Sequence, residues 1–421
     1  KQKTAYEMLR SLVGSEMCIR DRPGGVAVKV DEAIAIARQI GYPVLIRPSF
    51  VLGGRAMIIV YDESLLRKYI SEAVAVSESR PVLIDRFLEN AVEVDVDAIS
   101  DGERTVIGGI MEHVELAGIH SGDSACTLPP PTLSAGIQKV IREYTYAFAR
   151  ALGVRGLMNV QYAVAQDKVY VLEVNPRASR TVPFVSKATG VPLAKLAALV
   201  MAGWSLAELG FTREIAPRHF AVKEAVFPFV RFPGVDVILS PEMKSTGEVM
   251  GLDRSAGMAF YKSQVAAGNR IPTSGPMFIS VRDEDKDGLR ELAPRLQALG
   301  FTIYATRGTS TLLRNLGIPS QALFRISEGR PNVLDLIEER SVGWIVNTPS
   351  AGASPRVDEV HMRAQTVMRG IPITTTINGL RAAIEALETL QRYNGAMDVC
   401  SIQEYHRGMP KLTLPQELKS P

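Results

Sequence analysis

Hydrophobic and polar positions in the first part of the chain switch between helical and extended periods. Apolar residues recur at helical spacing from Val26 to Ile40, and Gly41 follows as a stop signal. Short apolar runs bounded by glycine, proline or polar turns indicate strands. The predicted helices are 26–40, 63–76, 134–152, 177–209 and 255–267, and the predicted strands are 43–47, 57–60, 81–87, 92–99, 158–165, 168–174 and 220–227.

Acidic and apolar residues alternate in the strand predicted at 92–99. Glu93, Asp95 and Asp97 occupy every second position. Alternation of this kind is typical of a sheet that packs one face on the core and leaves the other in water. We therefore expect the acidic face of this strand to be solvated.

Beyond the proline- and glycine-rich segment 268–276, short apolar strands alternate regularly with helices. Such alternation predicts a parallel, doubly wound sheet. The predicted strands are 277–281, 301–305, 322–326, 342–346 and 371–375, and the predicted helices are 285–299, 309–316, 333–339, 358–368 and 380–391.

Composition narrows the class of protein. With 421 residues, 46% hydrophobic and 22% charged, the chain can form two or three ordinary globular domains. The small net charge of +3, without basic clusters, argues against nucleic-acid binding, and the interrupted apolar runs argue against a membrane span. Three scattered cysteines suit neither a disulfide framework nor a zinc site, so we expect a cytoplasmic protein.

Residues 1–22 do not join the pattern that follows them. The segment Ser11–Arg22 resembles translated sequencing-adapter read-through, and no cap or strand pattern links it to Pro23. It is interpreted as a non-native leader, the alternative being a native helix start. Its five positive and three negative charges supply two of the three net charges, which leaves +1 for the remainder.

The strongest chemical signal is a group of polar residues within one predicted hairpin. Gln161 and Glu173 lie on strands joined by the turn 166–167, and Asn175 follows Glu173 by two positions, so their side chains share one face. Oxygen donors of this type suit Mg²⁺, which shares its sites with phosphate oxygens and water. Arg177 and Arg180, at a helix start, can converge on anionic oxygens.

A second, weaker signal precedes this hairpin. Arg47 ends a strand shortly before Gly53 and Gly54, and a glycine loop beside a cation can cradle phosphate, although a plain hairpin explains it equally well. Glu93 is a possible acceptor for ribose hydroxyls. The sequence has neither a Walker A motif nor a dinucleotide-binding glycine fingerprint.

Five segments carry a resemblance to a known family. Glu173–Arg180 resembles the metal and phosphate motif of ATP-grasp ligases. Four others resemble the carbamoyl-phosphate synthetase large subunit family specifically: Ser49–Ala56, Gly108–Glu115, His120–Ser124 and Thr181–Gly190. The match extends from about residue 28 to 395, and the last segment resembles the C-terminal half, which phosphorylates carbamate.

The resemblance implies a multidomain chain of α/β and α+β class. An ATP-grasp fold, expected at 23–240, is followed by a doubly wound parallel-sheet domain of methylglyoxal-synthase type at 275–396, which serves as an allosteric module. A helical segment and linker at 241–274 would join them, and 397–421 would be a tail.

It also implies roles for individual residues. The ATP phosphates would contact Arg47, Gly53 and Gly54, the adenine would contact Arg86 and Leu88, and the ribose would contact Glu93. The nucleotide pocket would be lined by Gly118, Ile119, His120 and Ser121. Mg²⁺ or Mn²⁺ would be bound by Gln161, Glu173 and Asn175. Arg177 and Arg180 would stabilise the transferring phosphoryl group.

Two effector sites are implied as well. A nucleotide effector would contact Ser280, Lys286, Thr306, Thr309 and Asn347. Pro349 stands where a hydroxyl residue would help, and Arg307 where a relative has histidine, so the identity of the effector stays open. An amino-acid activator would contact Glu115, Asp123, Lys223 and Glu224, four residues that ordinary ion pairing would explain equally well.

The resemblance implies phosphorylation of carbamate by MgATP, for arginine and pyrimidine biosynthesis, with a glutaminase small subunit as partner. Two alternatives stay open. One is another ATP-grasp ligase, such as a biotin-dependent carboxylase, although no biotinyl-lysine motif is present. The other is a truncated fragment that binds nucleotide effectors without catalysis. A methylglyoxal synthase proper would not carry a fused ATP-grasp domain.

Overall fold

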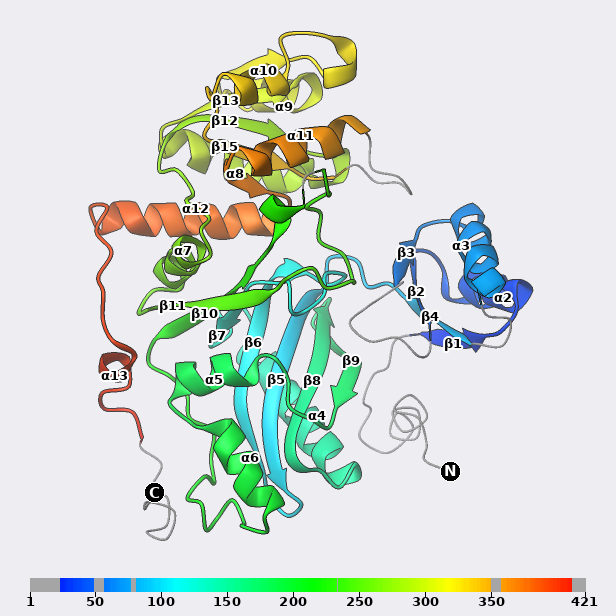
Figure 1. Ribbon diagram of the computed structural model, residues 1–421, viewed down its shortest axis with the longest axis vertical. Helices are drawn as coiled ribbons and strands as arrows, with labels where there is room; N and C mark the ends of the chain where they lie inside the picture. The colour runs from blue at the N-terminus through cyan, green and yellow to red at the C-terminus, as the bar shows by residue number, and fades with distance from the viewer. Residues whose placement is uncertain (1–22, 49–56, 77–80, 233, 350–356, 411–421) are drawn as a thin grey trace.

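The computed structural model describes residues 23–48, 57–76, 81–232, 234–349 and 357–410. They form a small N-terminal unit beside a large antiparallel sheet, with a parallel-sheet unit at one end (Figure 1). The predicted leader 1–22 and the glycine loop at 51–56 lie outside the described residues.

The small unit is a four-stranded sheet in the order β1-β4-β2-β3, on which two helices pack through an apolar core. The strands predicted at 43–47 and 57–60 are present as β2 and β3, and they pair antiparallel. The helix expected from Val26 begins instead at Val30, because Glu32 accepts the backbone N–H groups of Val28 and Lys29 and ends the extended segment there. The elements are β1 (Gly24–Ala27), α2 (Val30–Ile40), β2 (Val44–Pro48), β3 (Ile58–Val60), α3 (Glu63–Val76) and β4 (Val82–Arg86).

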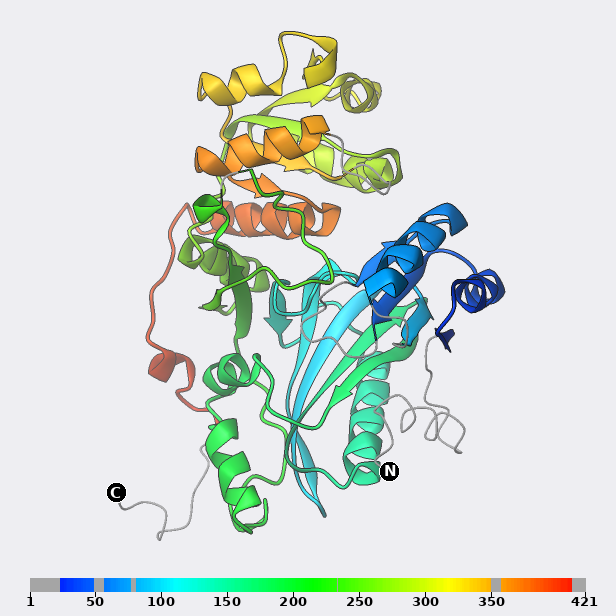
Figure 2. The same cartoon turned by 45° about the vertical axis from the view of Figure 1, so that its right-hand side comes forward.

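The central unit is a seven-stranded antiparallel sheet in the order β11-β10-β7-β6-β5-β8-β9. One apolar core lies between the sheet and α4, and another between the sheet and α5 and α6, which Figure 2 shows on opposite faces. The elements are β5 (Val92–Asp101), β6 (Thr105–Leu116), β7 (Cys126–Leu128), α4 (Ala135–Ala151), β8 (Arg155–Ala165), β9 (Lys168–Asn175), α5 (Val182–Thr189), α6 (Leu193–Met201), β10 (Phe220–Val226) and β11 (Gly247–Asp253).

The hairpin β8–β9 forms as the sequence predicts. Gln166 and Asp167 both have positive φ, 50° and 57°, as a two-residue turn of the type that matches strand twist requires. Strands β6, β7 and β11 escaped sequence prediction, although β6 contains an apolar run from Val106 to Met111 that is typical of a buried strand.

The prediction of one helix over 177–209 is wrong. The chain forms two helices, α5 and α6, bent by 113° at their junction. Gly190 adopts a left-handed φ of 72° and Pro192 cannot donate a helical hydrogen bond, so α5 ends at Thr189 and α6 begins only at Leu193.

The expectation of a solvated acidic face on β5 is also wrong. Glu93, Asp95 and Asp97 are 6%, 2% and 0% exposed. Ile99, two residues further along the same face, packs in the core that contains α5 and α6. Alternation therefore marks two chemically different faces here, both covered by protein.

The parallel-sheet unit is doubly wound, as predicted. Its strand order is β14-β13-β12-β15-β16, all pairs are parallel, and α8, α9 and α12 pack on one face while α10 and α11 pack on the other. The elements are β12 (Gly275–Ser280), α8 (Lys286–Ala298), β13 (Phe301–Thr306), α9 (Arg307–Asn315), β14 (Ser320–Leu323), α10 (Val333–Glu338), β15 (Trp344–Asn347), α11 (Val357–Met368), β16 (Ile373–Thr374) and α12 (Ile377–Arg392).

Two segments tie the units together. Helix α7 (Ala256–Ala266) follows β11 and packs between the central sheet and α12. Because β11 belongs to the central sheet, the boundary expected at residue 240 falls inside that unit. The expected tail returns through α13 (Ile402–Tyr405) to the central unit (Figure 1). Met409 is buried in the core that contains α5 and α6.

Within the described residues, no single helix has both the length and the apolar composition to cross a membrane; the bent pair α5 and α6 meets both criteria only when joined.

Candidate active site

Two rows of polar residues cross three neighbouring strands of the central sheet. In one row Gln161 lies opposite Asp95 on one side and Glu173 on the other. In the next row Asn159 lies opposite Asp97 and Asn175. Directly paired residues have Cβ atoms about 5 Å apart, so Gln161, Glu173 and Asn175 share a face, as the sequence predicts.

The donor atoms of this face fit a magnesium ion. The Gln161 amide nitrogen donates to Ser121 Oγ at 2.9 Å, which leaves its carbonyl oxygen for a cation. Glu173 is exposed, and Asn175 Oδ1 accepts a long bond, 3.3 Å, from Arg177. In the described part of the chain, no three His, Cys, Asp or Glu residues lie together as a metal site, so an ion here depends on amide and phosphate oxygens.

Arg177 and Arg180 lie in the turn between β9 and α5. The helix begins only at Val182, so the expectation that both occupy a helix start is wrong, and helical spacing does not set their separation. Arg177 N–H donates to Asn175 O at 2.8 Å, which holds the turn tight. Both guanidinium side chains are exposed, and Arg180 contacts Met243 Sδ.

The segment 118–122 lies beside this face. His120 N–H donates to Ser240 O at 2.9 Å, and His120 Nδ1 accepts from Gly122 N–H at 3.0 Å. Burial lowers the pKa of His120, so the ring is neutral near pH 7. Because Nδ1 accepts, the neutral ring carries its proton on Nε2 and can donate from that atom.

The same segment contacts the small unit. A Cβ added to Gly118 would lie 2.9 Å from the Phe87 ring and 3.3 Å from Ile59, and φ at Gly118 is 113°. Only glycine allows this approach and this backbone conformation. The contact brings the strand end before Leu88 against the segment that carries Ile119 and His120, so residues predicted for the nucleotide from both units meet here.

Two cations predicted for the nucleotide are engaged within the small unit. Arg47 Nε lies 3.3 Å from a carboxylate oxygen of Asp85, and Arg86 donates to Ile40 O at 2.8 Å at the end of α2. Arg86 N–H also donates to Pro23 O. The roles of Arg47 and Arg86 toward ATP stay predictions, and Gly53 and Gly54 lie outside the described residues.

The four residues predicted for an amino-acid activator are all buried or half-buried. Lys223 Nζ donates to the carbonyls of Ser121 and Gly122, and no carboxylate among the described residues forms an ion pair with it. Burial and the neighbouring Glu115 raise the pKa of Glu224 to about 8. Asp123 accepts the N–H groups of Lys244 and Ser245. Ordinary ion pairing therefore does not describe this group.

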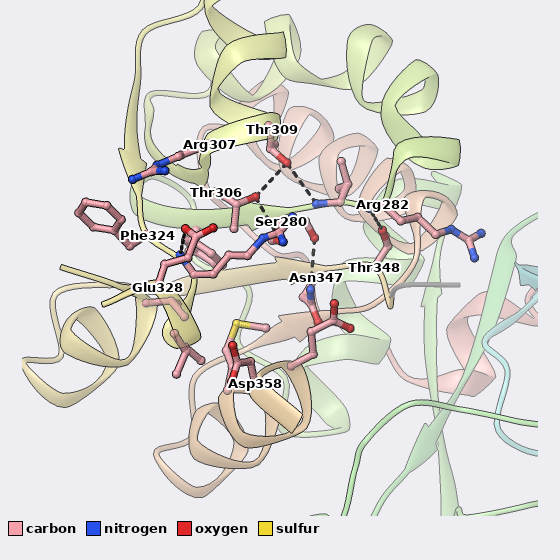
Figure 3. A pocket seen from close by; sticks show the side chains of 18 of the residues that line it. Ser280, Arg282, Thr306, Arg307, Thr309, Phe324, Glu328, Asn347, Thr348 and Asp358 are labelled. Carbon is pink, nitrogen blue, oxygen red and sulfur yellow. Dashed lines mark hydrogen bonds between the residues drawn. The ribbon is translucent and has the colours of Figure 1, made fainter. Parts of the chain in front are cut away.

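A separate cavity of about 470 Å³ lies at the carboxyl ends of the parallel strands. All five residues predicted for a nucleotide effector line it: Ser280, Lys286, Thr306, Thr309 and Asn347. Figure 3 shows Thr306 hydrogen-bonded to Ser280 and to Thr309, both at 3.3 Å, at the start of α9. Such a strand end, with helix N–H groups nearby, suits an anionic ligand.

Sequence reasoning missed Phe324, Ser240 and Met243. The Phe324 ring lies at the cavity wall, 4.4 Å from the Arg307 guanidinium, which the sequence analysis had named. Ser240 and Met243 contact His120 and Arg180 of the candidate site from a segment that is distant in the sequence. None carries a local motif, because each acquires its place through tertiary packing.

Comparison with known proteins supports both units. The chain matches the family models of the carbamoyl-phosphate synthase L chain ATP binding domain over residues 15–209 and of the MGS-like domain over residues 288–375. The expected fold class, ATP-grasp followed by a methylglyoxal-synthase-like domain, is thereby confirmed. A biotin carboxylase domain of a thermophilic 2-oxoglutarate carboxylase, solved with bicarbonate, is 18% identical with a TM-score of 0.46, covering 62% of each chain. That likeness is too distant to carry an argument.

Similarity to curated relatives is much closer. The carbamoyl phosphate synthase large chain of Archaeoglobus fulgidus is 56% identical over 91% of this chain, which spans only 35% of that relative's length. The C-terminal section of the large chain from Aquifex aeolicus is 49% identical, with 95% of this chain and 78% of that protein aligned. This chain therefore belongs to the carbamoyl phosphate synthase large chain family.

Proposed function

We propose that the chain transfers the γ-phosphoryl group of ATP to carbamate, giving carbamoyl phosphate and ADP. The observation that carries the proposal is the pairing of Gln161 with Glu173 beside Ser121 and His120, in a chain of this family. Mg²⁺ or Mn²⁺ bound by Gln161, Glu173 and Asn175 would neutralise the phosphate oxygens.

The chain's own residues supply positioning and charge. The exposed guanidinium groups of Arg177 and Arg180 are free of carboxylate partners among the described residues, so they can turn toward the transferring phosphoryl group. The neutral His120 can donate from Nε2. Phosphoryl transfer requires mainly alignment and charge neutralisation, so no side-chain nucleophile is needed.

The parallel-sheet unit is proposed to bind a nucleotide effector in its cavity, and the group around Lys223 to bind an amino-acid activator. In the whole enzyme a glutaminase subunit would supply ammonia, and the product would serve arginine and pyrimidine biosynthesis in the cytoplasm. These assignments draw on the relatives, of whose full length this chain spans about a third.

The proposal is tested by running the reaction in reverse. The protein is incubated with carbamoyl phosphate, ADP and Mg²⁺, and ATP is measured with luciferase; samples without carbamoyl phosphate or with EDTA serve as controls. Metal-dependent ATP formation is expected. If the protein binds ADP and nucleoside monophosphates but forms no ATP, the alternative of an effector-binding fragment is correct. Bicarbonate-dependent ATP hydrolysis without carbamoyl phosphate chemistry would indicate another ATP-grasp ligase.

A prediction for the effector cavity follows from its charge. Lys286→Met is expected to weaken binding of a nucleoside monophosphate by roughly 10- to 150-fold, because a hydrogen bond to a charged group contributes about 1.5–3 kcal/mol. Isothermal titration with purine and pyrimidine monophosphates measures the change. Lys195→Met, at an exposed position of α6, is the matched control. Equal affinity in both variants would show that the phosphate does not bind near Lys286.

A further inference from the structure

A carboxylate buried in the central sheet lies directly behind the arginine segment. Asp97, in β5, is 0% exposed. Its Oδ1 accepts from Asn159 Nδ2 at 3.0 Å and from Ser179 Oγ at 2.7 Å, and its Oδ2 accepts from Thr181 Oγ1 at 2.6 Å. Both oxygens are therefore committed, and two of the three donors come from the segment between β9 and α5.

Burial of the Asp97 carboxylate lowers the stability of the fold unless hydrogen bonds compensate for its lost hydration. Transfer of a charge from water to the interior costs several kcal/mol unless hydrogen bonds compensate. Burial raises the pKa of Asp97 to about 6, while the bonds from Thr181, Ser179 and Asn159 oppose that rise. Near pH 7.5 the group is therefore mostly ionised, and an ionised oxygen accepts hydroxyl donors more strongly than a neutral one.

The donors flank a residue proposed for phosphoryl transfer. Ser179 and Thr181 are the immediate neighbours of Arg180, and their hydroxyls also lie 2.8 Å from each other. The Thr181 hydroxyl makes no capping bond to α5, although Thr181 precedes the helix; it is turned to Asp97 instead. The backbone on both sides of Arg180 is thus tied to the middle of the sheet.

Resting on the proposed function, we infer that Asp97 is a positioning residue for phosphoryl transfer: by accepting from Ser179 and Thr181 it fixes the backbone that presents Arg180. It contacts no substrate itself. The same strand pairing places Asp97 opposite Asn159, one row from Gln161, so the carboxylate links the arginine segment to the sheet that bears the metal-binding face.

The test compares variants that loosen the segment with one that removes a buried hydroxyl elsewhere. Ser179→Ala combined with Thr181→Val removes both donors with little change in volume, and Asp97→Ala removes the acceptor. The control is Thr145→Val in α4, whose buried hydroxyl bonds Tyr162 in the core on the opposite face. Asp97→Asn is the conservative variant, because an amide can still accept from Asn159 and donate to Thr181.

We expect the double variant and Asp97→Ala to lower kcat for ATP formation by about 10- to 100-fold with little change in KM for ADP, because misplacement of a reacting group affects the transition state most. Asp97→Asn should recover part of the loss, and Thr145→Val should keep wild-type kcat. Equal kcat in the double variant and Thr145→Val, measured where both are folded, would overturn the inference.

Hydrogen exchange separates this inference from the proposed function. The backbone amides of residues 177–182 should exchange faster in Asp97→Ala and in the double variant than in wild type. In Thr145→Val their exchange rates should equal those of wild type. If wild type forms no ATP, the proposed function fails, and unaltered exchange in Asp97→Ala would then also refute the positioning role. Faster exchange with unchanged kcat would refute the link to transfer alone.

Discussion

Glu173→Gln is expected to lower the rate of ATP formation from carbamoyl phosphate and ADP by at least about 100-fold, because Glu173 supplies the carboxylate among the three residues proposed to bind the metal. Glutamine keeps the size of the side chain. Glu173 is exposed on β9, at the end of the sheet order, so the free energy of unfolding should change by no more than about 0.5 kcal/mol.

The measurement is initial velocity as a function of Mg²⁺ concentration, with thermal unfolding to check the fold. A loss that rising Mg²⁺ partly restores would point to weakened metal binding. Glu143→Gln, on an exposed turn of α4, changes the same charge away from the site and should behave as wild type. Undiminished ATP formation by Glu173→Gln would refute the metal assignment.

The arrangement of Gln161, Glu173 and Asn175 on one face was predictable because its information is local. Gln161, Glu173 and Asn175 lie within one hairpin, the turn at 166–167 has the polar residues that such turns need, and strand period fixes which side chains share a face. The parallel-sheet unit was predictable for a similar reason, since alternating strands and helices leave few topologies.

The sequence could not show whether each face of strand β5 contacts water or another part of the protein. The period of β5 separates Asp95 and Asp97 from their apolar neighbours, but a periodic pattern does not distinguish water from protein. Asp97 is enclosed by Ser179 and Thr181, more than 80 residues later in the chain. Arg180 was assigned to a helix because nothing local marks the first turn, which starts only at Val182.

Arg363 provides the clearest example of a contact without a local signal, and it carries the second large prediction. This residue of α11 is 0% exposed. Its Nε and Nη2 donate to the two carboxylate oxygens of Asp236 at 2.7 and 2.6 Å, and its Nη1 donates to Asn347 Oδ1 at 2.8 Å. Asn347 lines the effector cavity, whereas Asp236 belongs to the segment whose Ser240 carbonyl accepts from His120.

Arg363→Met is therefore expected to destabilise the parallel-sheet unit by about 3–5 kcal/mol, because it leaves the half-buried carboxylate of Asp236 without its partner. The chain has two tryptophans, and Trp344 lies fully buried in β15, three residues before Asn347. In a Trp204→Phe background, urea unfolding followed by tryptophan fluorescence reports on this unit alone. Arg369→Met, at an exposed position directly after the same helix, is the matched control and should unfold like wild type.

A double-mutant cycle decides whether the pair itself is responsible. Among the described residues, Asp236→Asn alone leaves the buried guanidinium of Arg363 with Glu359, 3.5 Å away, as its one anionic partner, so it should also destabilise the unit. The double variant Asp236→Asn/Arg363→Met should lose clearly less stability than the sum of the two single losses. Both charges of the pair are removed together, so neither is left without its partner. Additive losses would show that Arg363 stabilises the unit through packing, and unfolding of Arg363→Met at the midpoint of Arg369→Met would show that the ion pair contributes nothing.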